Sequence, residues 1–274
     1  MFEAEARASV GLVHPNIVRT HELLILGADG EFLLVMEFVH GLSLAELRDR
    51  RGDERLPVPV VAWIGAEVAR GLHHVHRRVS EDGTPSGLVH RDVAPPNVML
   101  GLDGAVKLID FGVAGALSGV HQSIDRSRRV GRPSYMAPEV LVGQPITASI
   151  DQYALGVTLY ELLVGERPHG AGEDAVEATL SGRHRPLLAA RPDLPPPFAL
   201  AVERAMSVHV AERFRDCGAL ARALLAAIPG TLDPRLALAD LVYGAASDVL
   251  PHEIEAVARL SRAATELFAA REQP

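Results

Sequence analysis

Cysteine is almost absent from the sequence: Cys217 is the only one among 274 residues. A single cysteine excludes an internal disulfide and any metal site built from a cysteine cluster, and it suits a reducing compartment. Long apolar runs are missing too, since no stretch approaches the roughly 18 consecutive apolar residues of a membrane-spanning helix. The first ten residues include acidic side chains where a signal peptide would be basic. These absences predict a cytoplasmic protein without a membrane span.

Basic residues are outnumbered by acidic ones, with 27 Lys and Arg against 35 Asp and Glu and a formal net charge of −8. Proteins that bind nucleic acids through electrostatic attraction present an excess of Lys and Arg. The charge balance therefore favours a protein or small-molecule partner over a nucleic acid. With 48% hydrophobic and 23% charged residues, the composition is that of an ordinary globular protein.

Hydrophobic patterning and turn residues predict a chain that begins with β-structure and becomes mainly helical. Ser43 and Glu46 form a capping box that starts a short helix, which ends near Gly52. The other predicted helices are 2–12, 57–79, 150–164, 173–181, 197–207 and 217–227, with about two more beyond residue 232. The predicted strands are 17–26 and 31–39, which flank a four-residue loop, and the short segments 88–89, 97–100 and 105–109.

Four short motifs carry the chemical information in the sequence. Each is weak alone, but their order, separations and predicted elements make a chance occurrence negligible. They are His90-Arg91-Asp92 with Asn97 five residues after the aspartate; Asp110-Phe111-Gly112 after a predicted strand; Ala137-Pro138-Glu139, preceded by Tyr135-Met136; and Asp151 in an apolar helix, with Arg213 much further on.

Together these motifs resemble the protein kinase family over roughly residues 1–228. The segments HPNIV at 14–18, MEFV at 36–39 and YMAPE at 135–139 are most similar to bacterial serine/threonine kinases of the eukaryotic type, and YMAPE argues against tyrosine kinases. The resemblance implies an α+β kinase-like fold. It divides the chain into a partial N-terminal lobe and hinge (1–39), a complete, mainly helical C-terminal lobe (40–228) and a helical extension of unknown role (229–274).

The implied activity is phosphoryl transfer from Mg-ATP to Ser or Thr hydroxyls of protein substrates in bacterial signalling. Such transfer depends on positioning and charge neutralisation more than on covalent help from the protein. Asp92 would orient the proton of the substrate hydroxyl, and Asn97 and Asp110 would hold the Mg²⁺ ions through oxygen atoms. The simpler alternative is that the two aspartates are solvated loop residues and that Asn97 forms a turn.

The resemblance also assigns roles outside the reacting groups. Glu37 and Val39 would contact adenine in the hinge with Met99 under the ring, and Glu5 would pair with a strand lysine. Glu139 and Arg213 would form a structural ion pair. Arg91 implies a basic pocket for a phosphorylated activation loop, with Ser118, Ser123 and Ser127 as candidates, and self-association could serve phosphorylation in trans. His90, Phe111, Gly112 and Asp151 complete the structural and regulatory set.

Two nucleotide-clamping parts of the family have no counterpart here, because only Met1 precedes Phe2. These are the glycine-rich loop and the strand lysine. Either the true start lies upstream, or the chain is a shortened pseudokinase that binds a protein partner with little or no phosphotransfer. The metal-ligand motifs favour the first explanation. A small-molecule kinase of similar fold is disfavoured by the YMAPE segment and by Arg213.

The phosphate site itself departs from the family at two positions. Ala94 stands where a lysine usually reaches the transferred phosphate, and Arg132 stands where a threonine is usual. We expect Arg132 to supply the missing positive charge, since a guanidinium suits phosphate oxygens. The alternative is an exposed arginine that contacts substrate peptide or solvent. A further pair, His73 and His76, has a spacing that could share a metal ion, although a polar helix end explains it more simply.

Overall fold

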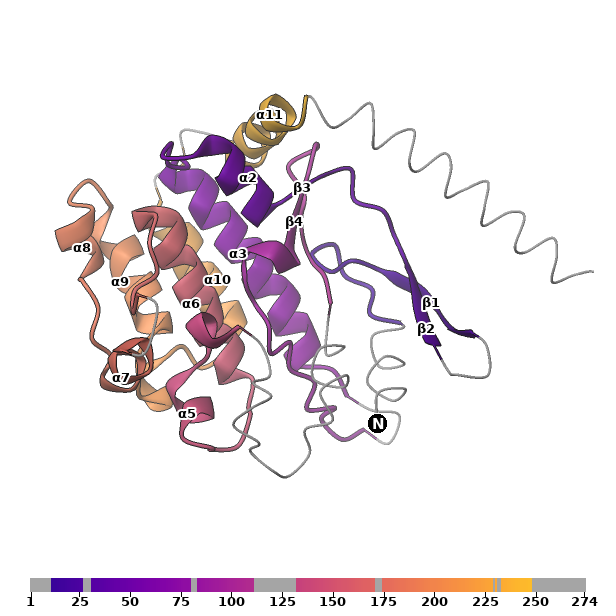
Figure 1. The fold of residues 1–274 in the computed structure, drawn as a ribbon, viewed down its shortest axis with the longest axis horizontal. Coiled ribbons are helices and arrows are strands. Elements are labelled where there is room, and N and C mark those ends of the chain that lie inside the picture. The colour runs from indigo at the N-terminus through magenta and orange to yellow at the C-terminus, as the bar shows by residue number, and fades with distance from the viewer. Residues whose placement is uncertain are drawn as a thin grey trace, which may run out of the picture.

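The computed structural model describes residues 11–26, 31–79, 83–110, 132–170, 174–228, 230 and 233–247 (Figure 1). A small β-hairpin lies at one side of a larger, mainly helical lobe. The predicted helix over 2–12 falls almost wholly outside the described residues, as does the tail after 247. The predicted α+β architecture, with few strands and a mainly helical C-terminal lobe, is present in the described residues.

The hairpin consists of β1 (Thr20–Leu26) and β2 (Glu31–Met36), which pair antiparallel as a two-stranded sheet. Both strands are shorter than the predicted ranges. Before β1, Ile17 forms a parallel bridge with Leu108, and the N–H of Val18 donates to the carbonyl of Leu108 at 2.8 Å. These backbone contacts join the hairpin side of the molecule to the sheet of the large lobe.

That second sheet has the order β3-β4-β5 and is made of β3 (Gly41–Ser43), β4 (Val98–Gly101) and β5 (Val106–Leu108). The strand β3 was not predicted. Conversely, the predicted strand at 88–89 is wrong, because these residues are irregular. A strand needs a neighbouring backbone to pair with, and the residues that follow 88–89 instead donate their N–H groups to a buried carboxylate.

The first helices begin as the sequence predicts. In α2 (Leu44–Arg51), the side chain of Ser43 accepts from the Glu46 N–H at 3.2 Å, and the Ser43 N–H donates to the Glu46 carboxylate at 2.7 Å. This reciprocal pair is the predicted capping box. The amphipathic helix is α3 (Val58–His76), whose apolar stripe is buried through the centre of the lobe.

Helices α6 (Ser149–Val164), α9 (Pro196–Ala205) and α10 (Cys217–Ala226) pack around α3 and one another (Figure 1). The approach of α6 to the end of α9 is close: a Cβ added to Gly156 would lie 2.6 Å from Cγ of Met206. The remaining elements are α5 (Pro138–Leu141), α7 (Asp174–Ser181), α8 (Leu187–Ala190) and the 3₁₀ turns η1 (Pro95–Asn97), η2 (Pro133–Tyr135) and η3 (Val210–Glu212).

Helix α11 (Pro234–Ala246) is the described part of the C-terminal extension, and it packs on the lobe against α2, α3, β3 and β4 (Figure 1). Its buried residues are Leu238, Val242 and Ala246. Gly104, with φ of +75°, sits beneath it, and a Cβ there would lie 2.1 Å from the Arg235 carbonyl oxygen. In the part of the chain that the structure describes, neither this helix nor another is both long and apolar enough to cross a membrane.

Candidate active site

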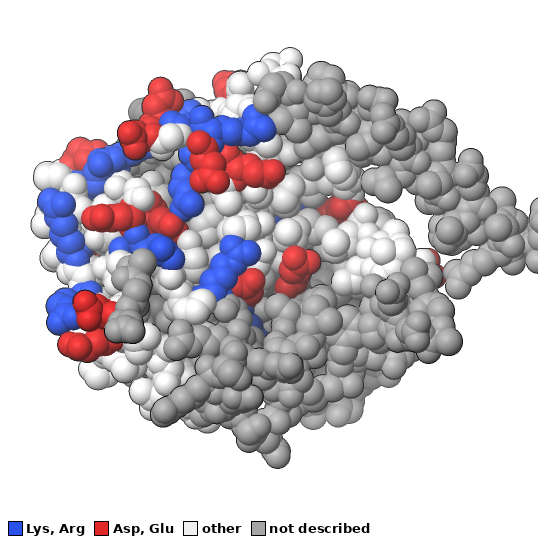
Figure 2. All heavy atoms as spheres, in the orientation of Figure 1, with Lys and Arg blue, Asp and Glu red and all other residues white. Residues whose placement is uncertain are grey.

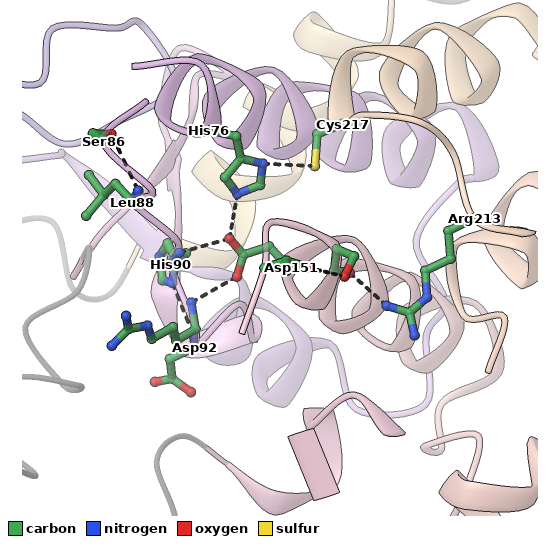
Figure 3. A network of polar contacts seen from close by, with 11 residues as sticks. His76, Ser86, Leu88, His90, Asp92, Asp151, Arg213 and Cys217 are labelled. Carbon is green, nitrogen blue, oxygen red and sulfur yellow. Dashed lines mark hydrogen bonds and ion pairs between the residues drawn. The ribbon is translucent and has the colours of Figure 1, made fainter. Parts of the chain in front are cut away.

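A buried carboxylate, Asp151 of α6, organises the loop that carries the predicted catalytic residues (Figure 3). It accepts hydrogen bonds from the backbone N–H groups of His90 at 2.8 Å and Arg91 at 2.9 Å, and from Nε2 of His76 at 2.7 Å. Burial by itself would raise the pKa of Asp151, but the hydrogen bond and charge of His76, with further help from His90, lower it below its ordinary value. The loop is therefore fastened to α6 through an ionised carboxylate.

Asp92 and Asn97 are brought together at the end of this loop. Nδ2 of Asn97 donates to both the backbone carbonyl and Oδ2 of Asp92, each at 2.8 Å. Since the amide nitrogen is used this way, the amide oxygen of Asn97 is left to act as an acceptor or a metal ligand. Oδ1 of Asp92 is buried, makes no hydrogen bond with the described residues, and lies 4.0 Å from Nε of Arg132.

Among the described residues, two that are not glycine have a positive φ angle. These are Arg91 at 70° and Asp110 at 63°. Such backbone conformations are uncommon for L-residues and persist only where the surroundings hold them. The side chain of Asp110 is exposed, two residues after the end of β5. Exposure and an oxygen donor suit the predicted contact with Mg²⁺.

His90 links the loop that carries Asp92 to the segment that precedes Asp110. Its Nε2 lies 2.9 Å from the carbonyl of Ile109, and its Nδ1 accepts the Asp92 N–H at 3.2 Å. These partners require Nε2 to donate and Nδ1 to accept, which describes a neutral imidazole. Burial lowers the pKa of His90, in agreement with that tautomer. The ring thus positions both acidic segments without adding charge.

The predicted ion pair between Glu139 and Arg213 is present and buried. Nη1 and Nη2 of Arg213 donate to the two carboxylate oxygens at 2.7 and 2.8 Å. Arg213 also donates to the carbonyls of Ser149 and Ser207 at 2.9 and 2.8 Å. Burial alone would raise the pKa of Glu139, but the bonds from Arg213 lower it. The pair ties α5 to the region before α10 and has a structural role.

Arg132 lies beside the carboxylate of Asp92, with Nε 4.0 Å from Oδ1, and is exposed. The turn that follows it is anchored to the helical lobe, because the hydroxyl of Tyr135 donates to Glu161 and the hydroxyl of Ser134 accepts from Arg167. On the face shown in Figure 2, acidic and basic side chains are interspersed over the helical lobe, and a small group of both signs lies near the middle.

The predicted hinge residues follow β2. The N–H of Glu37 donates to the Arg19 carbonyl at 2.9 Å, and the Glu37 carboxylate accepts from Nζ of Lys107 at 2.6 Å. Neither the Glu37 carbonyl nor the Val39 N–H has a backbone hydrogen bond within the described residues. Both groups are therefore available to a ligand. Met99 lies on β4 and is partly buried.

The histidine cluster at the end of α3 does not converge on one point. His76 bonds Asp151, and its other ring nitrogen lies 3.7 Å from Sγ of Cys217, whereas Nδ1 of His73 is 3.7 Å from Asp216. No metal-holding group of three His, Cys, Asp or Glu occurs in the described ranges. Burial raises the pKa of the Cys217 thiol, so it lacks the thiolate of a nucleophile. Sequence reasoning missed the part of His76 in the Asp151 network, since only the fold brings α3 and α6 together.

Several predicted site residues lie outside the described residues. They are Glu5, Phe111 and Gly112 and the candidate phosphorylation sites Ser118, Ser123 and Ser127. Their roles remain predictions.

Residues 2–216 match the protein kinase domain family. Tyrosine-protein kinase MasK of Myxococcus xanthus (strain DK1622) is 38% identical over 229 residues, which are 82% of this chain and 35% of MasK. Serine/threonine-protein kinase PknA of Mycobacterium tuberculosis is 33% identical over 237 residues, which are 85% of this chain and 52% of PknA. The chain therefore spans about a third to a half of the length of these relatives.

A solved structure gives the same result. The Mycobacterium tuberculosis PknI kinase domain superposes with a TM-score of 0.63 at 30% identity, covering 83% of this chain and 78% of that domain. The family match, the relatives and the shared fold agree with the catalytic-loop geometry. The chain belongs to the protein kinase family, within the eukaryotic-type kinases of bacteria.

Proposed function

We propose that this protein transfers the γ-phosphoryl group of Mg-ATP to Ser or Thr hydroxyls of protein substrates. The observation that carries the proposal is the pairing of Asp92 with Asn97 on a loop fastened to Asp151. One carboxylate oxygen is held by the Asn97 amide, while the other has no hydrogen bond with the described residues. This arrangement suits a group that orients a substrate hydroxyl and accepts its proton.

The donor set fits Mg²⁺, which prefers carboxylate, amide and water oxygens. The amide oxygen of Asn97 and the exposed carboxylate of Asp110 would hold the ion, which neutralises charge on the phosphates when bound. The Glu37 carbonyl and the Val39 N–H would meet the adenine edge, and Met99 would lie beneath the ring. Glu5 would complete the nucleotide site by pairing with a strand lysine.

The hydroxyl specificity is the finer part of the proposal. The relatives differ in this respect by name, since MasK is a tyrosine-protein kinase and PknA a serine/threonine-protein kinase. We assign Ser and Thr because the segment before Glu139 reads Tyr135-Met136-Ala137-Pro138, the form typical of serine/threonine kinases. Phosphoamino acid analysis of casein labelled from radioactive ATP should give phosphoserine and phosphothreonine. Phosphotyrosine as the main product would contradict the assignment.

The test of transfer uses the purified chain and a version extended upstream in the same reading frame. Each is incubated with radioactive ATP, Mg²⁺ and casein, with Asp110→Asn as the metal-site control. We expect Mg²⁺-dependent labelling that Asp110→Asn abolishes. Incorporation into the kinase itself that rises with protein concentration would support self-association for phosphorylation in trans. Mg-ATP binding without transfer in both forms would favour a pseudokinase that binds a partner.

A second component of the proposal concerns the phosphate site. The methyl group of Ala94 cannot reach a phosphate, whereas the Arg132 guanidinium stands 4.0 Å from Asp92. Arg132 therefore supplies the positive charge to the transferred group. Arg132→Ala should reduce turnover ~100-fold with little change in ATP affinity, and Arg132→Lys should restore part of it. Arg185→Ala, at an exposed position between α7 and α8, is the control. Unchanged turnover in Arg132→Ala would leave Arg132 as a surface residue.

A further inference from the structure

A hollow of about 740 Å³ lies away from the catalytic loop, where the end of α3 meets α10 and the chain before β1. We call it the basic hollow, because its charged lining consists of Arg70, Arg77, Arg78 and Arg222 with His73 and His74 among the histidines. None of the described residues that line it is Asp or Glu. In a chain with a net charge of −8, such a concentration of one sign on one concave surface calls for a physical account.

The arginines differ in how far they are already engaged. Arg70 forms an ion pair with Glu67, and the Glu67 carboxylate also accepts from Asn16 at 2.7 Å. Asp216 is occupied as the N-cap of α10, where it accepts from the Ala219 N–H at 2.7 Å. By contrast, the exposed Arg77 and Arg222 make no side-chain hydrogen bond or ion pair with another described residue. Two guanidinium groups, one at the C-cap of α3 and one on α10, thus remain to bind an anion.

Acidic and basic neighbours act in opposite directions on the histidines of the hollow. Burial is the largest cause of the lowered pKa of His73; Asp216 raises this pKa, and Arg77 and Arg222 lower it further. Burial likewise lowers the pKa of His14, with His74 and Arg70 adding to the effect and Glu67 opposing it. The cations that line the hollow thus disfavour another positive charge at this place. A dianion would relieve that repulsion.

The negative end of the α3 dipole accounts for only some of the basic residues that line the hollow. Basic residues are favourable in the last turn of a helix, and His73, His74 and His76 lie in the last turn of α3. Arg222 belongs to α10, however, and reaches the same space from the other side. The walls also include apolar side chains, namely Leu12, Val79 and Leu225. A concave site of this size with few convergent polar groups is typical of small-molecule binding.

We propose that the basic hollow binds a small phosphorylated metabolite, whose phosphate is held between Arg77 and Arg222. Guanidinium groups match phosphate oxygens in geometry as well as charge. Within the part of the chain that the structure describes, three segments line the space, which favours a compact ligand over an extended peptide. The site is independent of phosphotransfer. It does share the last turn of α3 with His76, the residue that bonds Asp151 beneath the catalytic loop, so an occupant would lie next to the support of that loop.

The test uses pyrophosphate as the probe, in Mg²⁺-free buffer, and follows the histidine ring signals of the intact chain by NMR. Signals of His73 and His74 should shift saturably, while the distant His169 and His209 should not respond. Arg77→Gln with Arg222→Gln should weaken binding at least ~10-fold, the loss expected for charge-assisted hydrogen bonds to phosphate. Arg183→Gln, whose side chain is 64% exposed elsewhere on the surface, should leave binding unchanged.

Unchanged unfolding midpoints will show that the arginine variants remain folded. Three results would overturn the proposal: no saturable shift up to ~10 mM pyrophosphate, equal weakening by Arg183→Gln, or tighter binding of a phosphoserine peptide than of pyrophosphate. The last result would assign the hollow to a phosphorylated protein segment instead.

Discussion

The catalytic loop and the basic hollow are opposite in charge and in construction. At the loop, a few carboxylates are each held by buried hydrogen bonds, and removing one partner leaves a buried group unsatisfied. In the basic hollow, Arg77 and Arg222 are exposed and contribute charge without supporting the fold. Substitutions under the loop should therefore act on stability and turnover together, whereas those in the hollow should act on ligand affinity alone.

The largest effect on stability is expected from Arg213→Ala. This change leaves the Glu139 carboxylate buried without its bidentate partner, and breaking a buried ion pair costs about 3–5 kcal/mol. Urea unfolding followed by circular dichroism measures the change. The double variant Glu139→Gln with Arg213→Met removes both charges and should recover part of the loss. A cost under about 1 kcal/mol for Arg213→Ala would show that the pair does not support the lobe.

A smaller loss of about 2–3 kcal/mol is expected from Asp151→Asn, because an amide NH₂ would face N–H donors of the catalytic loop. Turnover should fall as well. Asp49→Asn, at a side chain that is 73% exposed, serves as the control and should change the free energy of unfolding by less than about 0.5 kcal/mol. Equal effects of the two substitutions would show that the hydrogen bonds of Asp151 contribute no more to stability than an exposed surface carboxylate does.

The buried histidine His169 should also make the stability of the protein sensitive to acid. Burial lowers the pKa of His169, whose Nδ1 lies 3.1 Å from the Arg183 carbonyl and whose Nε2 lies 2.7 Å from the Tyr153 hydroxyl. Below the ordinary histidine pKa of about 6.5, the unfolded chain binds this proton more readily than the folded one. As the pH decreases below that value, the free energy of unfolding should therefore decrease by up to about 1.4 kcal/mol per pH unit for this group.

Urea unfolding between pH 7.5 and 5.5 measures that slope. His169→Gln should flatten it, and His209→Gln, at an exposed position, should not. A slope that His169→Gln leaves unchanged would mean that other groups cause the acid sensitivity.

The smallest effect is predicted for the basic hollow in the absence of ligand. Arg77→Gln and Arg222→Gln should each change the free energy of unfolding by less than about 0.5 kcal/mol, as is usual for exposed positions. A loss of about 2 kcal/mol or more would show that these arginines support the fold, as the buried groups under the catalytic loop do.

Local patterns predicted local structure well. The capping box at Ser43, the stripe of α3 and the extent of α6 follow from spacing alone, and the structure confirms them. The motifs also predicted the Glu139 and Arg213 pair, because both residues stand in family positions. The strand β3 escaped prediction because its three residues run directly into the capping box.

Long-range features could not be obtained in this way. The strand predicted at 88–89 shows that β-branched and apolar residues do not form a strand without a neighbouring backbone. The contact of His76 with Asp151 and the approach of Arg222 to Arg77 join residues far apart in sequence. No spacing rule reports such pairs. The placement of α11 beside Gly104 depends in the same way on the assembled fold.

The role of Asp92 as the acceptor of the substrate proton is tested most directly by the single-turnover rate of Asp92→Asn with saturating Mg-ATP and casein. The amide keeps the shape of the carboxylate but cannot accept the substrate proton. We predict a rate reduced ~10²–10⁴-fold with ATP affinity within about twofold of the unchanged chain. A rate equal to that of the unchanged chain would contradict the assignment of Asp92 as the catalytic residue.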